Sequence, residues 1–359
     1  MFELRRDAIT GWWVAVVVER AYDRRRFARR AEPVAAPRCA NCFEPPGGGV
    51  RVRMLKAHAF SVAGDEGEEA DERAPARADG GAEGRGEARP EVQREPRQGR
   101  LGLVADIGSW ATIVAPPEHH QALAHEDPAI VGELLARARE TIAKARQADQ
   151  TEYVQVVQNW GRQAGALTNH LCLDTYDLPQ IPHRVGEELG GAARYLIREG
   201  VCPYCRLVRD ETASRERLVF EDAAAVAFAP YASRSPFELW VVPRRHEADF
   251  GRATDADLTS AAETLRKVLA LLDVLDGPPY NLVLHTAPLR ERVDETYHWH
   301  WEIHPRLREI AGLELGTGLP VNPISPEEAV ADLLPAPGIE APERREWTAP
   351  DWAERARER

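Results

Sequence analysis

Four metal-capable residues recur in the same order in both halves of the chain, and their spacing constrains the fold more than any other feature. The first half carries Cys39 and Cys42, then His119 and His170. The second half carries the corresponding set in chain order: Cys202, Cys205, His246 and His298. The two histidines of each set are 51 residues apart in the first half and 52 in the second. This agreement suggests an internal duplication.

The step from the second cysteine to the first histidine differs, at 77 residues in the first half and 41 in the second. Residues 64–100 account for the difference. These 37 residues contain no aromatic residue and one β-branched residue, Val92. Such a segment buries too little apolar surface to offset its ordering entropy, so we expect a disordered insertion. Without it the first-half step is 40 residues, and two independent spacings agree to within one residue.

Each set offers two thiolates and two imidazoles, which are zinc ligands and fill a tetrahedral shell. Soft and borderline ligands of this kind argue against magnesium or calcium. We therefore expect two structural Zn²⁺ sites per chain. The alternative for each Cys-x-x-Cys pair is a pair of incidental thiols, which the repeated spacing disfavours.

Hydrophobic periodicity predicts an α+β fold built on antiparallel sheet with flanking helices. The expected strands are Trp13–Val18, Tyr153–Val157, Ala225–Ala229, Leu239–Val242, Asn281–Leu284 and His298–Ile303. The expected helices are Pro128–Ala148 and Ala256–Val274, where apolar residues recur at helical spacing.

Polar and aromatic residues alternate along 297–304, which has the sequence YHWHWEIH. A strand with this pattern places its polar residues on one face, namely His298, His300, Glu302 and His304. With His298 on a metal, we expect His300 to be oriented and exposed to a ligand, as a nucleophile or general base. The alternative is a row of surface histidines. The intervening Trp299 and Trp301 should face the core.

A glycine-containing stretch, NWGRQAGA at 159–166, follows a predicted strand and precedes His170. Gly161 and Gly165 allow backbone amides to approach an anion closely, and Asn159 can donate a hydrogen bond to a phosphate oxygen. The pattern becomes informative through its position, because Asn159 lies eleven residues before a predicted metal ligand.

Charge and hydropathy exclude some classes of partner. The chain has 46 Lys and Arg against 58 Asp and Glu, a net charge of −12. This balance argues against nucleic-acid or anionic-membrane partners, which need a basic face. The most apolar early segment, Trp12–Val18, is too short to span a bilayer and lacks a cleavage site. We expect a cytoplasmic protein.

Several longer motifs resemble the galactose-1-phosphate uridylyltransferase family of the histidine-triad superfamily. They are NWGRQAGA (159–166), PYASRSPFELWVVP (230–243), NLVLHTAP (281–288) and YHWHWEIHPRL (297–307). The resemblance runs from residues 3–14 to residues 311–318 and 326–329. It implies a tandem pair of histidine-triad-like half-barrels, over 1–195 and 196–334, with a charged tail at 335–359.

The resemblance also implies a chemistry. The family, whose members are often dimeric, moves a nucleoside monophosphate from a nucleotide sugar to a second phosphate acceptor through a nucleotidyl-histidine. Residue matching then implies a function for five groups of positions. Cys39, Cys42, His119 and His170 match the family's first zinc site, and Cys202, Cys205, His246 and His298 the zinc set of single-unit relatives. His285 and Glu188 match metal ligands of some members, in an alternative arrangement with His298 and His300. Asn159, Gly161, Gly165 and Asn281 fall in the phosphate-side motifs, and Glu314 falls where the family contacts the hexose.

The chain departs from the family at the nucleophile. The family's His-Pro-His-x-Gln run reads His170-Leu-Cys-Leu-Asp here, which puts Cys172 in the nucleophile position and Asp174 in place of the phosphate-orienting glutamine. A carboxylate beside a phosphate costs on the order of a few kcal/mol unless it is protonated or paired.

Three interpretations stay open. Catalysis could use Cys172, or it could have moved to His300 and Glu302 in the second half. Alternatively, catalysis could be lost, leaving a zinc-held scaffold that binds a nucleotide sugar or a partner protein. As a class, the residues favour a nucleotidyltransferase of galactose-metabolism type.

Overall fold

The computed structural model describes residues 2–18, 24–33, 49–55, 109–116 and 121–334. The predicted ligands Cys39, Cys42 and His119 lie outside these residues, as do the 64–100 segment and the 335–359 tail. In the described part, no helix combines the length and apolar character needed to cross a bilayer.

A nine-stranded sheet forms the centre of the molecule, in the order β3-β4-β6-β5-β10-β11-β9-β8-β7, and every neighbouring pair is antiparallel. Its strands are β3 (Arg51–Leu55), β4 (Ser109–Val114), β5 (Tyr153–Trp160), β6 (Cys172–Leu178), β7 (Leu218–Glu221), β8 (Ala225–Phe228), β9 (Leu239–Pro243), β10 (Tyr280–His285) and β11 (His300–Pro305). First-half strands occupy one side of the sheet and second-half strands the other, and β5 and β10 join them. The sheet stays open, with β3 and β7 at its edges.

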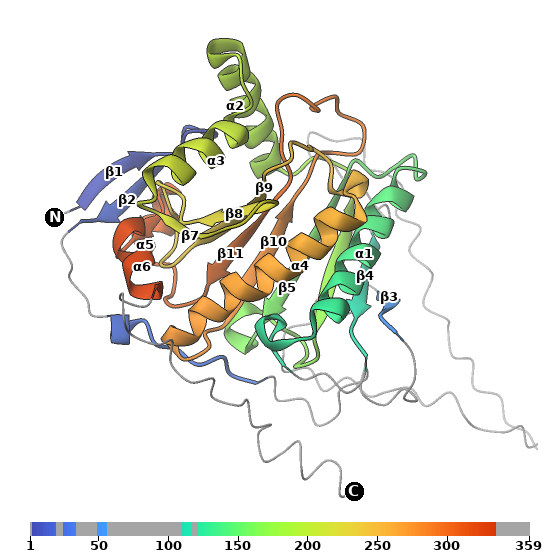
Figure 1. Cartoon of the computed structure of the whole chain (residues 1–359), viewed down its shortest axis with the longest axis horizontal. Helices are drawn as coiled ribbons and strands as arrows, with labels where there is room; N and C mark the ends of the chain where they lie inside the picture. The colour runs from blue at the N-terminus through green and yellow to red at the C-terminus, as the bar shows by residue number, and fades with distance from the viewer. Residues whose placement is uncertain (1, 19–23, 34–48, 56–108, 117–120, 335–359) are drawn as a thin grey trace, which may run out of the picture.

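Two helices cover one face of this sheet and lie side by side across it (Figure 1): α1 (Pro128–Ala145) and α4 (Asp255–Ala270). Asp127 caps the first helix, and a capping box of Thr254 and Asp257 starts the second. Their apolar faces, including Leu134 and Leu265, form the main core with inward-facing strand residues. The α+β class with antiparallel sheet and flanking helices is confirmed.

The predicted elements exist, with small shifts at their ends. The helix expected over Pro128–Ala148 ends at Ala145, and the helix expected to Val274 becomes a 3-10 turn, η6 (Leu271–Leu275). The strand expected from His298 starts at His300. Trp299 and Trp301 face the core as predicted, with Phe250 packed edge-on against both rings.

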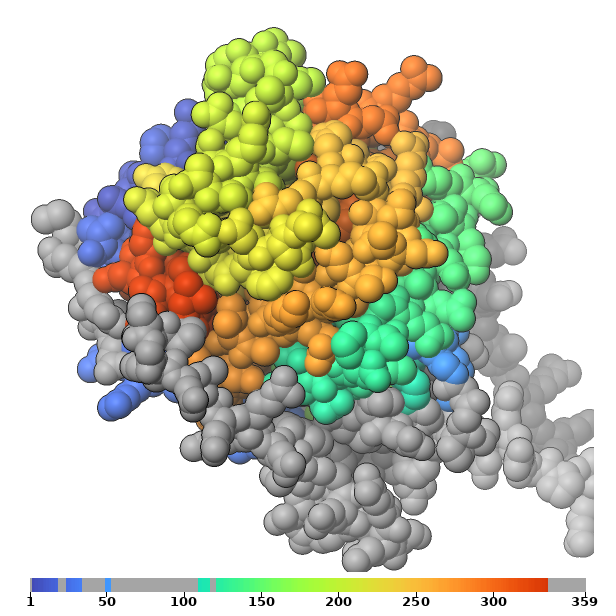
Figure 2. Space-filling view, viewed as in Figure 1, coloured from blue at the N-terminus to red at the C-terminus, as the bar shows by residue number. Residues whose placement is uncertain are grey.

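Among the described residues, helices cover the opposite face of the sheet only over its second-half strands. There lie α2 (His183–Glu199), α3 (Pro203–Ser214) and a small sheet of β1 (Phe2–Arg6), β2 (Trp13–Val17) and β12 (Val321–Asn322). The short helices α5 (Gly312–Thr317) and α6 (Pro326–Leu333) follow. In the space-filling view, α2 and α3 form a raised surface between the N-terminal strands and α4 (Figure 2).

The N-terminal hairpin packs closely on α2 at Gly191. A Cβ built at this glycine would lie 1.9 Å from the carbonyl oxygen of Ile9, which is backbone and cannot swing away. Gly186 lies on the same helix with nothing within 4 Å of such a Cβ. The first glycine is therefore required by packing and the second is not.

We expect Gly191→Ala to lower the free energy of unfolding by about 3 kcal/mol, because the hairpin must move away from the helix. Gly186→Ala, the matched control, should raise it by about 0.5–1 kcal/mol through better helix propensity. Urea unfolding of the two variants measures the difference, and equal effects would contradict the packing assignment.

Candidate functional site

The face of the sheet opposite α1 and α4 carries polar residues in register from both halves. Asn281 of β10 pairs with Asn159 of β5 on one side and with His304 of β11 on the other. The pairing of β5 with β6 ends at Val157 and Asp174, and strand alternation places Asn159 and Cys172 on the same face as this pair. Cross-strand neighbours share a face, so Cys172, Asn159, Asn281 and His304 form one row across the two halves.

At the first-half end of this row, a hydrogen bond from Asn281 orients the Asn159 side chain. The Asn281 Nδ2 group donates to Asn159 Oδ1 at 2.7 Å and to the Ala164 carbonyl at 2.8 Å. Because a carbonyl only accepts, this pair of bonds fixes the orientation of the Asn281 amide. Asn159 Oδ1 is thereby occupied, and its Nδ2 has no acceptor among the described residues. Cys172, the first residue of β6, is half-buried beside it.

The glycine turn after β5 has the backbone that glycine permits. Gly161 and Gly165 have φ of +81° and +82°, and they flank the 3-10 turn η4 (Arg162–Ala164). A Cβ at Gly161 would also lie 2.9 Å from Pro279 Cβ. The turn therefore needs Gly161 for both conformation and close approach.

Asp174 lies on the same face of β6 as Cys172. Its Oδ1 accepts a hydrogen bond from Thr112 Oγ1 at 2.8 Å and a longer one from Trp110 Nε1 at 3.4 Å. Burial raises the pKa of Asp174, and these two hydrogen bonds only partly oppose the rise. Tyr176, two residues further along, stacks on Trp110 with ring centroids 5.3 Å apart.

In the second half the same face is filled by ion pairs centred on Glu302, which is fully buried. Arg184 Nη2 of α2 donates to both its oxygens, at 2.8 and 2.7 Å. Arg234 and His304 donate to Oε2 at 2.8 and 2.9 Å. Burial alone would raise the pKa of Glu302, but Arg184 and His285 hold it well below its usual range.

A second carboxylate extends this cluster toward α2. His285 Nδ1 lies 2.9 Å from Glu188 Oε2, and its Nε2 lies 3.2 Å from Glu302 Oε2. The Tyr297 hydroxyl donates to Glu188 at 2.7 Å. Although burial lowers the pKa of His285, the two carboxylates raise it to about 9. The imidazole is therefore a cation held between two anions.

The expectation that His300 is exposed to a ligand is wrong. Its side chain is fully buried, because three rings pack against it with centroids about 5 Å away: His285 at 4.9 Å, Trp240 at 4.9 Å and Tyr204 at 5.0 Å. Its Nδ1 donates to the His298 carbonyl at 2.9 Å. Its Nε2 has no hydrogen-bond partner among the described residues. None of these covering rings is near His300 in sequence, so the strand pattern alone could not reveal them.

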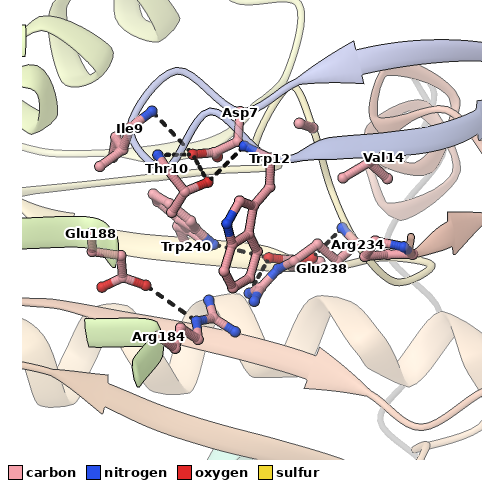
Figure 3. A pocket seen from close by; sticks show the side chains of 12 residues that line it. Asp7, Ile9, Thr10, Trp12, Val14, Arg184, Glu188, Arg234, Glu238 and Trp240 are labelled. Carbon is pink, nitrogen blue, oxygen red and sulfur yellow. Dashed lines mark hydrogen bonds and ion pairs between the residues drawn. The ribbon is translucent and has the colours of Figure 1, made fainter. Parts of the chain in front are cut away.

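A pocket of about 440 Å³, mouth included, lies beside this cluster under the N-terminal hairpin. Figure 3 shows Trp12 reaching from the hairpin into this space, toward Arg184 and Glu238. Glu238 Oε1 accepts from Trp240 Nε1 at 3.1 Å and from Arg234 Nη2 at 3.0 Å. The second-half pocket is thus walled by residues already paired with one another.

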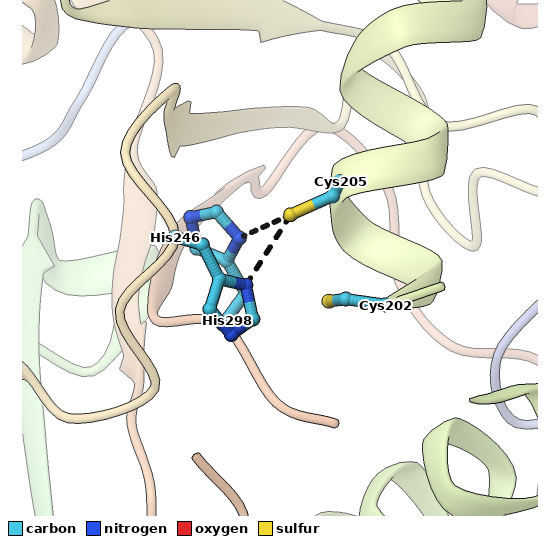
Figure 4. A group of neighbouring side chains, drawn as sticks. All are labelled: Cys202, Cys205, His246 and His298. Atoms are coloured by element: carbon cyan, nitrogen blue, oxygen red, sulfur yellow. Dashed lines mark hydrogen bonds between the residues drawn. The ribbon is translucent and has the colours of Figure 1, made fainter. Parts of the chain in front are cut away.

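Cys202, Cys205, His246 and His298 come together as predicted (Figure 4). Their ligand atoms all lie within 4.8 Å of one another. Cys205 Sγ is 3.2 Å from His246 Nδ1 and 3.6 Å from His298 Nδ1, close to the sulfur–nitrogen separation of about 3.5 Å that tetrahedral zinc bond lengths imply.

The surroundings of this group also suit a metal. His246 Nε2 donates to the Asp294 carbonyl at 2.6 Å, which leaves Nδ1 facing the centre of the group. Hydrogen bonds from Cys202, then His246 and His298, lower the pKa of the Cys205 thiol, which favours the thiolate that zinc binds. The donor set therefore fits Zn²⁺.

Of the first-half ligand set, only His170 is described. It is buried, and its Nε2 donates to the Ala115 carbonyl at 2.8 Å. Two other groups of His and Glu side chains lie close enough to hold an ion: His285, His300 and Glu302, and Glu238, Glu302 and His304. The cations Arg184 and Arg234 already neutralise Glu302 in both.

Glu314, the predicted hexose contact, starts α5 and is paired within its own segment. It forms an ion pair with Arg308 and accepts hydrogen bonds from the backbone of Ala311 and Val321. Its contact with a sugar stays a prediction.

No family model matches the sequence. The chain is 30% identical over 237 residues to ADP-glucose phosphorylase of Arabidopsis thaliana, across 65% of this chain and 66% of that relative, which is just under two thirds of its length. It is 27% identical over 235 residues to galactose-1-phosphate uridylyltransferase of Thermotoga maritima, across 63% of this chain and 73% of that relative.

Solved structures extend the match to nearly the whole fold. An Arabidopsis thaliana ADP-glucose phosphorylase with bound ADP-glucose superposes with a TM-score of 0.68 and 26% identity, across 93% of this chain and 98% of that one. A uridylyltransferase structure gives a TM-score of 0.66 and 27% identity, across 93% and 97%. In sequence and in fold, the chain is similar to the galactose-1-phosphate uridylyltransferase family.

The sequence analysis did not predict the two arginines that pair with Glu302 in the second-half cluster. Arg184 lies in the first turn of α2, and Arg234 lies in the loop before β9. Neither belongs to a metal or phosphate motif. The signal that could have found them is the buried Glu302, because a buried carboxylate requires cationic partners.

Removing the charge of Glu302 should break the ion pairs that hold this cluster together. Glu302→Gln leaves Arg184, Arg234 and His285 without their shared anion, and we expect it to lower the free energy of unfolding by about 3–5 kcal/mol. Glu309→Gln is the matched control, since Glu309 forms an exposed pair with Arg29 and should cost less than about 1 kcal/mol. Thermal or urea unfolding measures both variants. Equal losses of unfolding free energy in Glu302→Gln and Glu309→Gln would contradict a stabilising role for the buried cluster.

Proposed function

We propose that this protein is a nucleotidyltransferase that takes a nucleoside monophosphate from a nucleotide sugar at the first-half end of the polar face. The observation that carries the proposal is the sheet face that Cys172 shares with Asn159, whose Nδ2 has no acceptor among the described residues. The names of the relatives support the substrate class, and one solved relative contains ADP-glucose.

The contrast between the two halves favours Cys172 over His300 as the nucleophile. Cys172 is half-buried and lies on a face that the described helices leave open. His300 is enclosed by three rings, and its neighbour Glu302 is bound by two arginines and two histidines. A phosphate could reach His300 only after this cluster had come apart.

The proposed reaction has two displacement steps. The Cys172 thiolate attacks the α-phosphorus, a sulfur–phosphorus bond forms, and the bond to the sugar phosphate breaks with departure of the sugar phosphate. An oxygen of the acceptor phosphate then attacks the same phosphorus and returns the thiolate. Asn159 Nδ2 donates to a non-bridging oxygen, where charge increases in each transition state.

Zinc enters the proposal as a structural ion. Cys202, Cys205, His246 and His298 would hold one ion and clamp the start of α3 to the strand that carries the polar row. His170 with Cys39, Cys42 and His119 would hold the second. A zinc ion with four protein ligands supplies no open position, so its contribution is to stability.

The remaining sequence expectations are carried as part of the same proposal. The two repeats would divide after residue 195, and the protein would be cytoplasmic. It would form a homodimer and would bind no nucleic acid. The net charge of −12 supports the last of these.

One observation favours a second candidate, a zinc-stabilised protein that binds nucleotides without transferring them. Asp174 shares the face of Cys172, and an ionised carboxylate there would repel a phosphate. The labelling experiment below separates this candidate from the transferase.

With UDP-glucose or ADP-glucose labelled in the α-phosphate, we expect a covalent label on the wild-type chain that is released by mercuric ion, which cleaves sulfur–phosphorus bonds. Cys172→Ser should abolish the label, and His300→Gln should retain it. A label that resists mercuric ion, survives base and is lost in acid would indicate a nucleotidyl-histidine instead. Nucleotide binding in calorimetry with no label would select the binding protein.

Metal analysis tests the structural ions. We expect about two zinc per chain, and Cys202→Ser and Cys39→Ser should each lose one and destabilise the fold by several kcal/mol. Cys172→Ser, a cysteine outside both sets, should retain both ions. A Cys202→Ser protein with unchanged zinc content would refute the assignment.

A further inference from the structure

Asp174 lies close enough to the proposed reaction centre to contact the substrate. It follows Cys172 by two residues on the same face of β6, a separation of about 7 Å along the strand. A diphosphate whose α-phosphorus is held for attack by Cys172 therefore extends within reach of this carboxyl group. Whether Asp174 repels or binds the phosphate depends on its protonation state.

The hydrogen bonds of Asp174 leave one oxygen for a ligand. Thr112 and Trp110 both donate to Oδ1, and no described residue donates to Oδ2. The first bond also ties Asp174 to β4, so the carboxyl group is oriented before substrate arrives. A protonated Oδ2 would be a hydrogen-bond donor without an acceptor among the described residues.

We propose that Asp174 binds the diphosphate of the nucleotide sugar as the uncharged carboxylic acid, by donating a hydrogen bond from Oδ2–H to a phosphoryl oxygen. The inference rests on the proposed function, because it places the diphosphate beside Cys172. In this role Asp174 is a binding residue that couples nucleotide affinity to a proton.

The surroundings favour the uncharged form. Burial already raises the pKa of Asp174, and a bound phosphate, as a neighbouring anion, raises it further. The groups on its own strand face are Cys172 and Tyr176. The groups facing it from the neighbouring strands are Thr112 and Trp110 of β4 and Val157 of β5, none of which is charged, and β3 places Arg53 opposite Thr112 in the register.

Because the folded carboxyl is protonated more readily with phosphate bound than without it, binding takes up a proton at a pH above the pKa of the free enzyme. Affinity is therefore highest at low pH. It falls by up to tenfold per pH unit between the pKa of the free enzyme and the higher pKa of the complex, and it levels off above the latter. Nucleotide sugars suit the test, since their diphosphate diester does not titrate near neutrality.

Calorimetry with the full chain tests the inference. Titrations of UDP-glucose and of ADP-glucose, in two buffers of different ionisation enthalpy between pH 6 and 9, give the affinity and the number of protons taken up. For the wild type we expect uptake approaching one proton and an affinity that falls with pH. Asp174→Asn retains a donor at the same position but cannot titrate, so binding should persist to high pH with no uptake.

Asp177→Asn is the matched control. Asp177 lies on the same strand three residues away and accepts a hydrogen bond from Ser109 of β4, on the face opposite to Asp174. This variant should behave as the wild type. The wild-type pH dependence supports or contradicts the inference even if a variant fails to fold.

Three results would count against it in different ways. Wild-type binding with no proton uptake would overturn the role of Asp174 and leave the proposed function intact. Uptake that persists in Asp174→Asn would assign the proton to another group and overturn the inference too. Failure of the wild type to bind either nucleotide sugar at any pH would overturn the proposed function, and this inference with it.

Discussion

The antiparallel pairing of β5 with β10 is the contact on which the rest of the molecule depends. It joins the two halves of the chain into one sheet and sets a register in which Asn281 of the second half lies opposite Asn159 of the first. A shift of this register by one residue would turn Asn281 toward the core. The hydrogen bond between the two amides would then be lost, and with it the orientation of the Asn159 donor.

The same face of the sheet is used differently in the two repeats. In the second repeat it is filled by a carboxylate, two arginines and two histidines, which are satisfied by one another and covered by α2. In the first repeat the corresponding positions hold Cys172 and Asp174, with uncharged neighbours on β4. Among the described residues, the second-half face is therefore closed by its own ion pairs, whereas the first-half face carries no such cluster.

The sequence was sufficient for features whose signal is local or repeated. Helical periodicity located α1 and α4, and the repeated Cys and His spacing found the group formed by Cys202, Cys205, His246 and His298. The alternation of polar and aromatic residues along 297–304 correctly predicted that Trp299 and Trp301 face the core. These predictions needed only the geometry of one element or a comparison of the two halves.

Features that depend on long-range packing could not be predicted in this way. The burial of His300 comes from rings at positions 204, 240 and 285, which three different elements bring together. The pairing of Glu302 with Arg184 joins residues 118 positions apart. The row that contains Cys172 and Asn159 likewise appears only once strand order and register are known.

The most direct test of the account is a crystal structure of the protein soaked with ADP-glucose or UDP-glucose, because the position of the diphosphate decides which repeat is the reaction centre. We predict a diphosphate at the first-half end of the polar row, with Asn159 Nδ2 in hydrogen-bond contact and Cys172 Sγ facing the α-phosphorus. A diphosphate bound instead beside Arg184 and Trp240, next to His300, would contradict the account.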